Sequence, residues 1–235
     1  MSANLINLLI EATGQTLYMV AISALLGTLL GLPLGLFLAT SQRGELLSAP
    51  WVNKVLGLVV NATRSVPFII LVVAIIPFTR MVAGTSIGTT AAIVPLTIAT
   101  VPFIARLVEN AIREVDSGLI EAARAMGATP LQIIRKVLLP EALPGITLGL
   151  TLAIVSLIGY SAMVGAVGGE GLGDLGIRYG YQRFMPDVMA AIDRRTHHSR
   201  CRQTRHQKRR AIAPVSSSQF RFPVKGAYTC YALRP

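Results

Sequence analysis

Long uncharged stretches separate short polar segments along the first 190 residues of the chain. Three of these stretches, residues 12–42, 81–105 and 142–169, contain no charged side chain. A further apolar stretch runs from about Val55 to Phe78 and carries Asn61, Arg64 and Pro67 in its first half. A helix needs roughly 20 apolar residues to cross the hydrocarbon core of a bilayer. The pattern therefore predicts four membrane-spanning helices, the fourth from about Pro144 to Ala166.

The composition agrees with an all-α integral membrane protein. Of the 235 residues, 52% are hydrophobic and 14% are charged, whereas about a quarter of the residues in a soluble domain are charged. Within the first stretch, Gly27, Gly31 and Gly35 are spaced four residues apart. Small residues at this spacing allow two membrane helices to approach closely, so we expect another helix to pack on this side of the first span.

The loop predicted between the third and fourth spans, residues 106–141, is the most basic part of residues 1–190. Its basic residues are Arg106, Arg113, Arg124, Arg135 and Lys136. Loops rich in Lys and Arg remain on the cytoplasmic side of a membrane. This loop is therefore predicted to be cytoplasmic, which places the N-terminus and the start of segment 168–187 outside.

The basic loop contains a patterned segment that ends at Pro140. Apolar residues recur in it at the spacing of one helical face: Leu119, Ala123, Met126, Leu131, Ile134 and Leu138. Gly127 is predicted to end a first short helix, because glycine adopts the left-handed conformation without steric cost. Thr129, Pro130 and Gln132 predict the start of a second helix with a capping box. The expected product is an amphipathic helix–turn–helix beside the membrane, a shape that can dock into a groove of another protein.

The same segment resembles the cytoplasmic coupling loop of bacterial ABC importer permeases. The residues that match this pattern are Glu121, Ala122, Ala123, Gly127, Val137, Leu139 and Pro140, with valine at 137 where isoleucine is usual. In that family the loop inserts into a cleft on the ATP-hydrolysing subunit. The resemblance implies that Glu121–Met126 contacts the ATPase, with Ala122 and Ala123 against it and Glu121 paired with a base or a backbone amide. The alternative is an interfacial amphipathic helix without a partner.

Residues 1–190 as a whole resemble one branch of this family, the permeases of bacterial methionine importers. The resemblance extends over segments 61–80, 101–128 and 169–184. It implies a type I importer fold with five spans per chain, a homodimer, two ATP-binding subunits that hold the ATP, and an external binding lipoprotein. It also implies a place in the inner membrane and transport of D- or L-methionine by alternating access. Two alternatives remain: the same machine carrying another amino acid or small substrate, or a non-transport membrane protein whose basic tail binds lipid or nucleic acid.

Enzyme motifs are absent from the sequence or lie in the wrong context. Residues 171–176 match G-x-G-x-x-G, but a dinucleotide site needs a βαβ unit around this motif. A glycine-rich external loop or re-entrant turn is expected there instead. The sequence has no phosphate-binding G-x-x-x-x-G-K-[ST] loop, no metal-site spacing and no paired nucleophile and base. We expect a permease subunit that is not itself an enzyme and holds no cofactor.

Met163 is a candidate gate residue. It is a bulky, flexible side chain in a run of small residues, 161–169, at the outer end of the fourth span. Two copies of this residue could meet across the axis of a dimer. Ordinary packing within the span is the alternative interpretation.

The tail, residues 191–235, differs in composition from the rest of the chain. Eleven of the 22 Lys and Arg residues follow residue 190, with Asp193 as the only acid there. The net charge of +11 is therefore no sign of a nucleic-acid partner for residues 1–190. A fifth span begins at Pro186 but meets Asp193, Arg194 and Arg195 long before it reaches the roughly 20 residues that a crossing requires. We interpret residues 193–235 as the product of a frameshift or sequencing error near codon 192, and expect them to be disordered.

Overall fold

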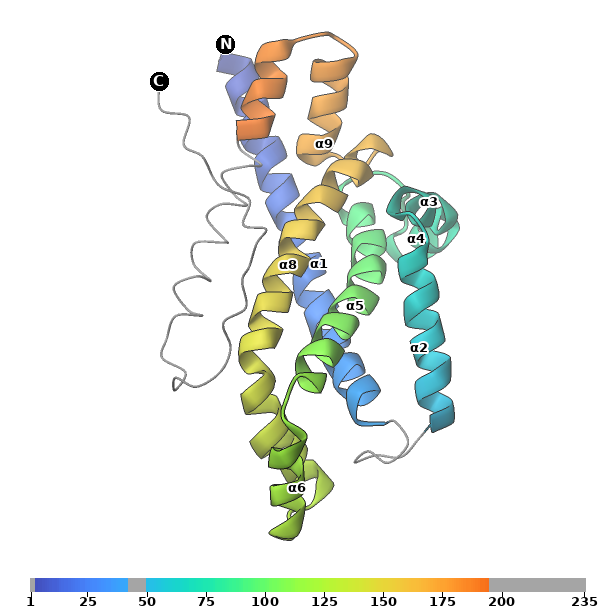
Figure 1. The fold of residues 1–235 in the computed structure, drawn as a ribbon. Coiled ribbons are helices and arrows are strands. Elements are labelled where there is room, and N and C mark those ends of the chain that lie inside the picture. Colours follow the sequence, from blue (N-terminus) through green and yellow to red (C-terminus); the bar gives the residue numbers. More distant parts are fainter. Residues whose placement is uncertain (1–2, 42–49, 195–235) are drawn as a thin grey trace, which may run out of the picture.

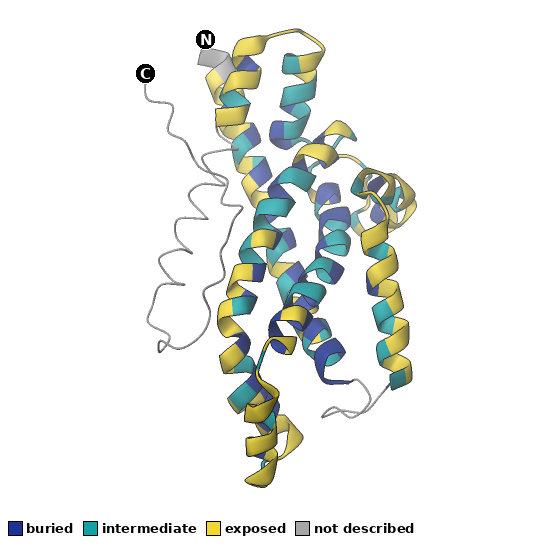
Figure 2. Cartoon of the chain, viewed as in Figure 1, coloured by how far each residue is buried: buried dark blue, intermediate teal, exposed yellow. Residues whose placement is uncertain are grey.

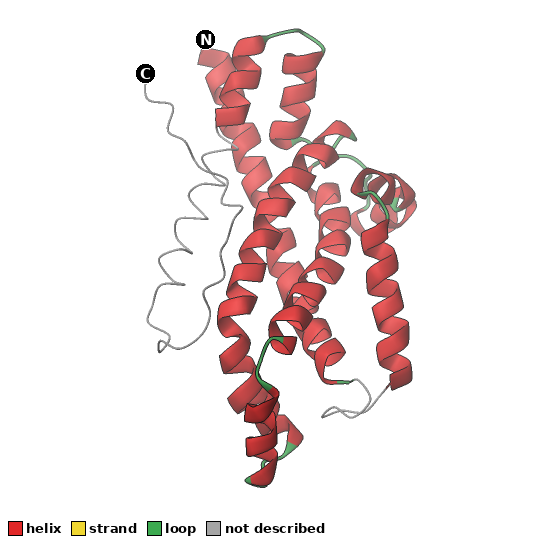
Figure 3. Cartoon of the chain, viewed as in Figure 1, coloured by secondary structure: helices red, strands yellow, loops and turns green. Residues whose placement is uncertain are grey.

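The computed structural model describes residues 3–41 and 50–194, and all regular structure in this part of the chain is helical (Figure 3). The elements are α1 (Ala3–Thr40), α2 (Pro50–Ser65), α3 (Phe68–Ala74), α4 (Ile76–Ala83), α5 (Thr89–Arg113), α6 (Ser117–Ala125), α7 (Pro130–Ile133), the π-helical turn η1 (Ile134–Leu138), α8 (Leu139–Ala166), α9 (Gly171–Leu175) and the π-helical turn η2 (Gly176–Tyr181). Residues 186–194 are also helical.

Three helical segments of the described residues are long and apolar enough to cross a membrane, namely α1, α5 and the rod Pro130–Ala166. The bent pair α2 and α3 makes a fourth if it counts as one span. The all-α membrane fold predicted from the sequence is thus confirmed. The third span lies later than expected, because α4 occupies the start of the stretch. Gly84 and Gly88, at φ 72° and 105°, then turn the chain before α5 begins.

The second predicted span is not a continuous helix. Its two halves, α2 and α3, meet at an angle of 105°. Pro67 lies at the bend, with φ −54° and ψ 133°. Proline has no backbone N–H and disfavours helical conformation in the residue before it, so α2 ends at Ser65. The Pro67 carbonyl accepts hydrogen bonds from the Ile70 and Leu71 N–H groups and starts the new helix.

Close packing of α1 against α5 forms the centre of the bundle. An added Cβ at Gly27 would lie 2.6 Å from Thr100 Cγ2, and one at Gly31 would lie 2.9 Å from the Val101 carbonyl oxygen. At Gly35 it would meet the Ala105 carbonyl oxygen. The predicted glycine ridge is therefore confirmed, and α5 is its partner. Helix α8 packs against both α5 and α1, and its Gly149 approaches the Leu107 side chain of α5.

The glycine-rich motif at 171–176 is helical, where a glycine-rich external loop or a re-entrant turn was expected. Two side chains of α1 cap its first turn: Gln15 Oε1 accepts from the Gly171 N–H at 3.1 Å, and Thr16 Oγ1 accepts from the Leu172 N–H at 2.9 Å. The motif's glycines serve close packing, because a Cβ at Gly173 would meet the Ala162 backbone. This end of the molecule lies opposite α6 (Figure 1).

The last described residues begin the helix predicted at Pro186. Val188 is buried in a small apolar cluster with Leu9 and Ala12 of α1 and with Leu172 and Leu175 of α9. The predicted disorder of residues 193–235 falls, apart from residues 193 and 194, outside the described residues.

Candidate functional site

Helix α6 starts the segment that projects from the bundle (Figure 1). Asp116 caps it, since its Oδ1 accepts from the Gly118 N–H at 2.8 Å. This cap satisfies a backbone donor that the first turn of a helix leaves free. Only Glu114, Val115 and Asp116 separate α6 from the end of α5 at Arg113.

The turn after α6 has the geometry predicted for Gly127. This residue has φ +79°. Its N–H donates to the Arg124 carbonyl at 2.9 Å, and the Ala128 N–H donates to the Ala123 carbonyl at 3.1 Å. These two bonds form a Schellman motif, which pairs carbonyls that the helix end leaves free. The turn therefore has a defined shape.

The second half of the segment is continuous with the span that follows. Gln132 Oε1 accepts from the Thr129 N–H at 2.9 Å, the capping-box bond that the sequence predicted. The Leu139 N–H donates to the Ile134 carbonyl, which carries the helix through the π-helical turn into α8. Residues Pro130–Ala166 thus form one rod of 37 residues. A force applied to α7 therefore acts directly on α8.

The apolar residues of the segment divide into a buried set and an exposed set. The sequence had predicted that they share a single face. Ala123, at 3% exposure, is buried with Ile134 and Leu138 in the main core cluster of the chain. By contrast, Met126 and Leu131 are 82% and 73% exposed. The expectation that the Ala123 side chain faces a partner is therefore wrong, because α6 uses this small residue to pack against η1.

The other residues of the coupling pattern lie along the same projection, which is largely exposed (Figure 2). Exposed members of the pattern are Glu121, Ala122, Gly127 and Pro140, and Val137 and Leu139 are half-buried. Met163 lies on α8 near its other end and is 47% exposed. Its role as a gate stays a prediction.

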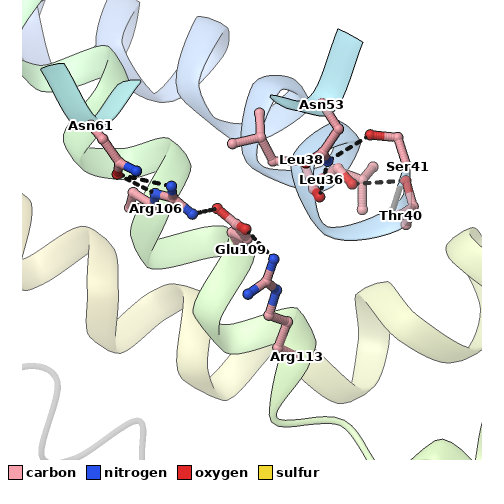
Figure 4. Close-up of polar contacts among 9 residues, drawn as sticks. All are labelled: Leu36, Leu38, Thr40, Ser41, Asn53, Asn61, Arg106, Glu109 and Arg113. Carbon is pink, nitrogen blue, oxygen red and sulfur yellow. Dashed lines mark hydrogen bonds and ion pairs between the residues drawn. The ribbon is translucent and has the colours of Figure 1, made fainter. Parts of the chain in front are cut away.

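An ion-pair cluster around the buried Glu109, near the end of α5, was missed by the sequence analysis, which placed its residues in or beside a loop. Glu109 is 1% exposed and pairs with Arg106 at 2.5 Å and with Arg113 at 2.6 Å (Figure 4). Asn61 Oδ1 of α2 accepts from Arg106 Nη2 at 2.8 Å. The spacing of three and four residues on one helix was the available signal.

No three His, Cys, Asp or Glu side chains gather in a way that could hold a metal ion within residues 3–41 and 50–194. The site described here is a protein surface joined to spanning helices.

These features define a class of protein: a polytopic helical membrane protein in which a capped, outward-projecting segment continues into a span. The chain belongs to the family of binding-protein-dependent transport system inner membrane components, whose model matches residues 31–192. It is accordingly a multi-pass protein of the bacterial inner membrane and a component of a transport system.

Relatives in this family are 50–60% identical to the chain over the aligned residues, and one of them, the probable D-methionine transport system permease protein MetI of Vibrio cholerae, is 60% identical over 184 residues, covering 78% of this chain and 82% of the relative. The chain is 54% identical over 165 residues to the D-methionine transport system permease protein MetI of Yersinia pestis, covering 70% of this chain and 76% of the relative. The MetI protein of Escherichia coli K12 is 52% identical with the same coverage.

Solved structures share the fold. A structure of the MetNI methionine ABC transporter in an inward-facing conformation superposes with a TM-score of 0.87 at 46% identity, covering 90% of this chain and 98% of that chain. An amino acid ABC transporter solved with histidines superposes with a TM-score of 0.68 at 22% identity, covering 86% and 94%.

Proposed function

We propose that this chain is the membrane-spanning permease subunit of an ATP-driven methionine importer. Two copies form the path, two ATP-binding subunits dock on the cytoplasmic side, and an external binding protein delivers the substrate. The chain itself hydrolyses no ATP and moves methionine by alternating access. The observation that carries this proposal is the 46% identity to the MetNI permease over 98% of that chain.

The coupling segment, residues 117–140, is the proposed contact with the ATP-binding subunit. Met126 and Leu131 are largely exposed although they are large and apolar, and exposed apolar groups rimmed by polar ones mark interaction sites. Glu121, Ala122 and Gly127 lie exposed on the same projection. Because α7 is continuous with α8, closure of two docked ATP-binding subunits would tilt this span. Met163 is proposed to line the outer part of the path on that span.

Residues 1–190 are proposed to be the permease unit, and residues 191–235 to lie outside it. The family match ends at residue 192, close to the point where the composition changes. No function is proposed for the basic tail.

Uptake of labelled methionine into proteoliposomes tests the function directly. The vesicles contain the permease and its ATP-binding subunit in the membrane, ATP inside, and the binding protein outside. We expect uptake that requires all of these components and that unlabelled D- or L-methionine competes away. If the vesicles take up a different amino acid on ATP hydrolysis and methionine is neither transported nor a competitor, the proposed substrate is wrong.

The docking surface has a separate test. Leu131→Asp should abolish co-purification of the ATP-binding subunit, because it places a charge on an apolar contact. Ile87→Asp is the matched control, since Ile87 is also an exposed apolar residue and lies before α5, at the far end of that helix from α6. If Leu131→Asp and Ile87→Asp both retain the ATP-binding subunit, the surface is assigned wrongly.

A further inference from the structure

Helix α2 is attached to the bundle mainly through polar contacts. Val60 is its only buried residue. The exposed side of the helix is apolar and includes Trp51, Val55 and Leu58. On the inner side, Asn53 Nδ2 donates to the Leu38 carbonyl at 2.7 Å and to Ser41 Oγ at 2.9 Å. Helix α2 therefore lacks the kind of apolar packing interface that joins α1 to α5.

Glu109 is the centre of the second polar attachment. Each of its two carboxylate oxygens pairs with a different arginine, Arg106 or Arg113. Arg106 then donates to the side-chain oxygen of Asn61 through Nε at 3.2 Å and through Nη2 at 2.8 Å. Without Glu109, the Arg106 guanidinium would lose the ion pair that fixes its orientation toward α2. Glu109 is the buried member of these pairs, whereas the Arg106 and Arg113 side chains are 20% and 45% exposed.

The cluster extends from α2 to the start of the coupling segment. Arg106 precedes Glu109 by three residues and Arg113 follows it by four, so the three side chains form a row along α5 (Figure 4). Arg113 is the last residue of α5. A cavity of about 280 Å³ lies beside this row, between α2 and α5, and Lys54 and Gly57 help to line it. Arg106 reaches α2 through its hydrogen bonds to Asn61, while both ion pairs of Glu109 lie within α5. A second polar contact between the two helices places the Arg64 guanidinium 5.8 Å from the centre of the Phe103 ring.

We propose that Glu109 is a positioning residue that makes α2 follow the coupling segment. Movement of α6 displaces the end of α5 with Arg113. Helix α5 carries this displacement along its length, and Arg106, held in orientation by Glu109, passes it to Asn61 and hence to α2. The bend between α2 and α3 absorbs the remaining rotation. This inference rests on the proposed function, because it assigns α2 a part in the same nucleotide-driven movement.

Distances between spin labels in the two copies of the complex test the proposal. The background carries Cys201→Ser and Cys230→Ser. One label is placed at Val55→Cys on α2 and, in a second preparation, at Ala125→Cys on α6. Both sets are measured with the ATP-binding subunit in lipid nanodiscs, with ADP and with trapped ATP. In the parent protein both distances should change on ATP trapping.

Glu109→Gln should keep the change at residue 125 and lose most of the change at residue 55. Methionine uptake per ATP hydrolysed should fall about tenfold, the size of a typical coupling between sites. Glu109→Asp keeps the charge, so it should restore part of the distance change at residue 55 and part of the methionine uptake per ATP hydrolysed. The matched control Glu114→Gln alters an exposed glutamate at the end of the same helix and should behave like the parent.

Asn61→Ala provides a second variant that leaves the ion pairs of Glu109 in place. It should show the same loss at residue 55, and adding Glu109→Gln should not deepen the loss. Unchanged movement at residue 55 in Asn61→Ala and in any assembled Glu109→Gln complex would overturn the positioning role while leaving the transport function intact. A parent complex that shows no nucleotide-driven change at either label would instead contradict the proposed function, and the positioning role with it.

Discussion

Replacing Gly31 by alanine should force α1 away from α5 and destabilise the bundle. The new Cβ would lie 2.9 Å from the Val101 carbonyl oxygen and 2.9 Å from Ile104 Cβ. Non-bonded carbon atoms are most favourable at roughly 3.5–4.0 Å, so the helices would have to separate by about half an ångström or more. Val101 and Ile104 are part of α5 itself, and its backbone cannot rotate out of the way as a side-chain tip can.

The magnitude follows from two opposing effects. Overpacking of a tightly packed interior costs about 1–3 kcal/mol. Alanine is favoured over glycine within a helix by about 0.5–1 kcal/mol. The net loss for Gly31→Ala should therefore lie between about 0 and 2.5 kcal/mol in the free energy of unfolding, with a central value of about 1 kcal/mol.

Gly14→Ala is the matched control on the same helix. A Cβ at Gly14 would meet nothing within 4 Å, so this variant should be as stable as the parent or up to about 1 kcal/mol more stable. The assay is equilibrium unfolding of the purified permease in mixed detergent micelles, followed by circular dichroism. If Gly31→Ala is as stable as Gly14→Ala, the glycine contact between α1 and α5 is not the one described.

Four further predictions concern the coupling segment, the path and the tail. Gly127→Ala should raise amide hydrogen exchange in α6, because alanine at φ +79° costs about 1–2 kcal/mol although a Cβ would find open space; unchanged exchange would contradict this. Ala123→Asp should lower the unfolding temperature of the permease alone, while Ala122→Asp should not and should instead weaken binding of the ATP-binding subunit; equal unfolding temperatures would refute the division into buried and exposed residues. Met163→Cys should cross-link between the two copies in the resting state, and failure to do so would count against the gate. Resequencing of the gene around codon 192 should reveal another frame that encodes about 20 apolar residues, and its absence would mean that residues 193–235 need another explanation.

The main features of the fold were accessible from the sequence because membrane spans are long and uncharged. The glycine spacing in α1 and the caps at Gly127 and Thr129 were equally readable, since each depends on residues close in the chain. The 105° bend between α2 and α3 was not predicted. Proline is tolerated within spans, as Pro95 and Pro102 of α5 show, so the presence of Pro67 alone could not reveal a break.

The candidate site was predictable only in part. The pattern at 121–140 located the coupling segment, but helical periodicity could not tell which apolar residues face the chain's own core. Ala123 is buried and Met126 is exposed because η1 packs against one side of α6, and that contact depends on the turn between them. Glu109 was overlooked for a different reason. Its burial depends on α5 extending to Arg113, beyond the uncharged stretch that marked the span.

The most direct test of the proposed transport function is ATP hydrolysis by the reconstituted complex with and without substrate-loaded binding protein. The complex in proteoliposomes should hydrolyse ATP faster when the methionine-loaded binding protein is present. It should accumulate labelled methionine in the same vesicles, and Leu131→Asp should abolish both effects. If the rate of ATP hydrolysis is the same with and without the methionine-loaded binding protein, and the vesicles take up no methionine, the assignment of this chain as a methionine importer permease is contradicted.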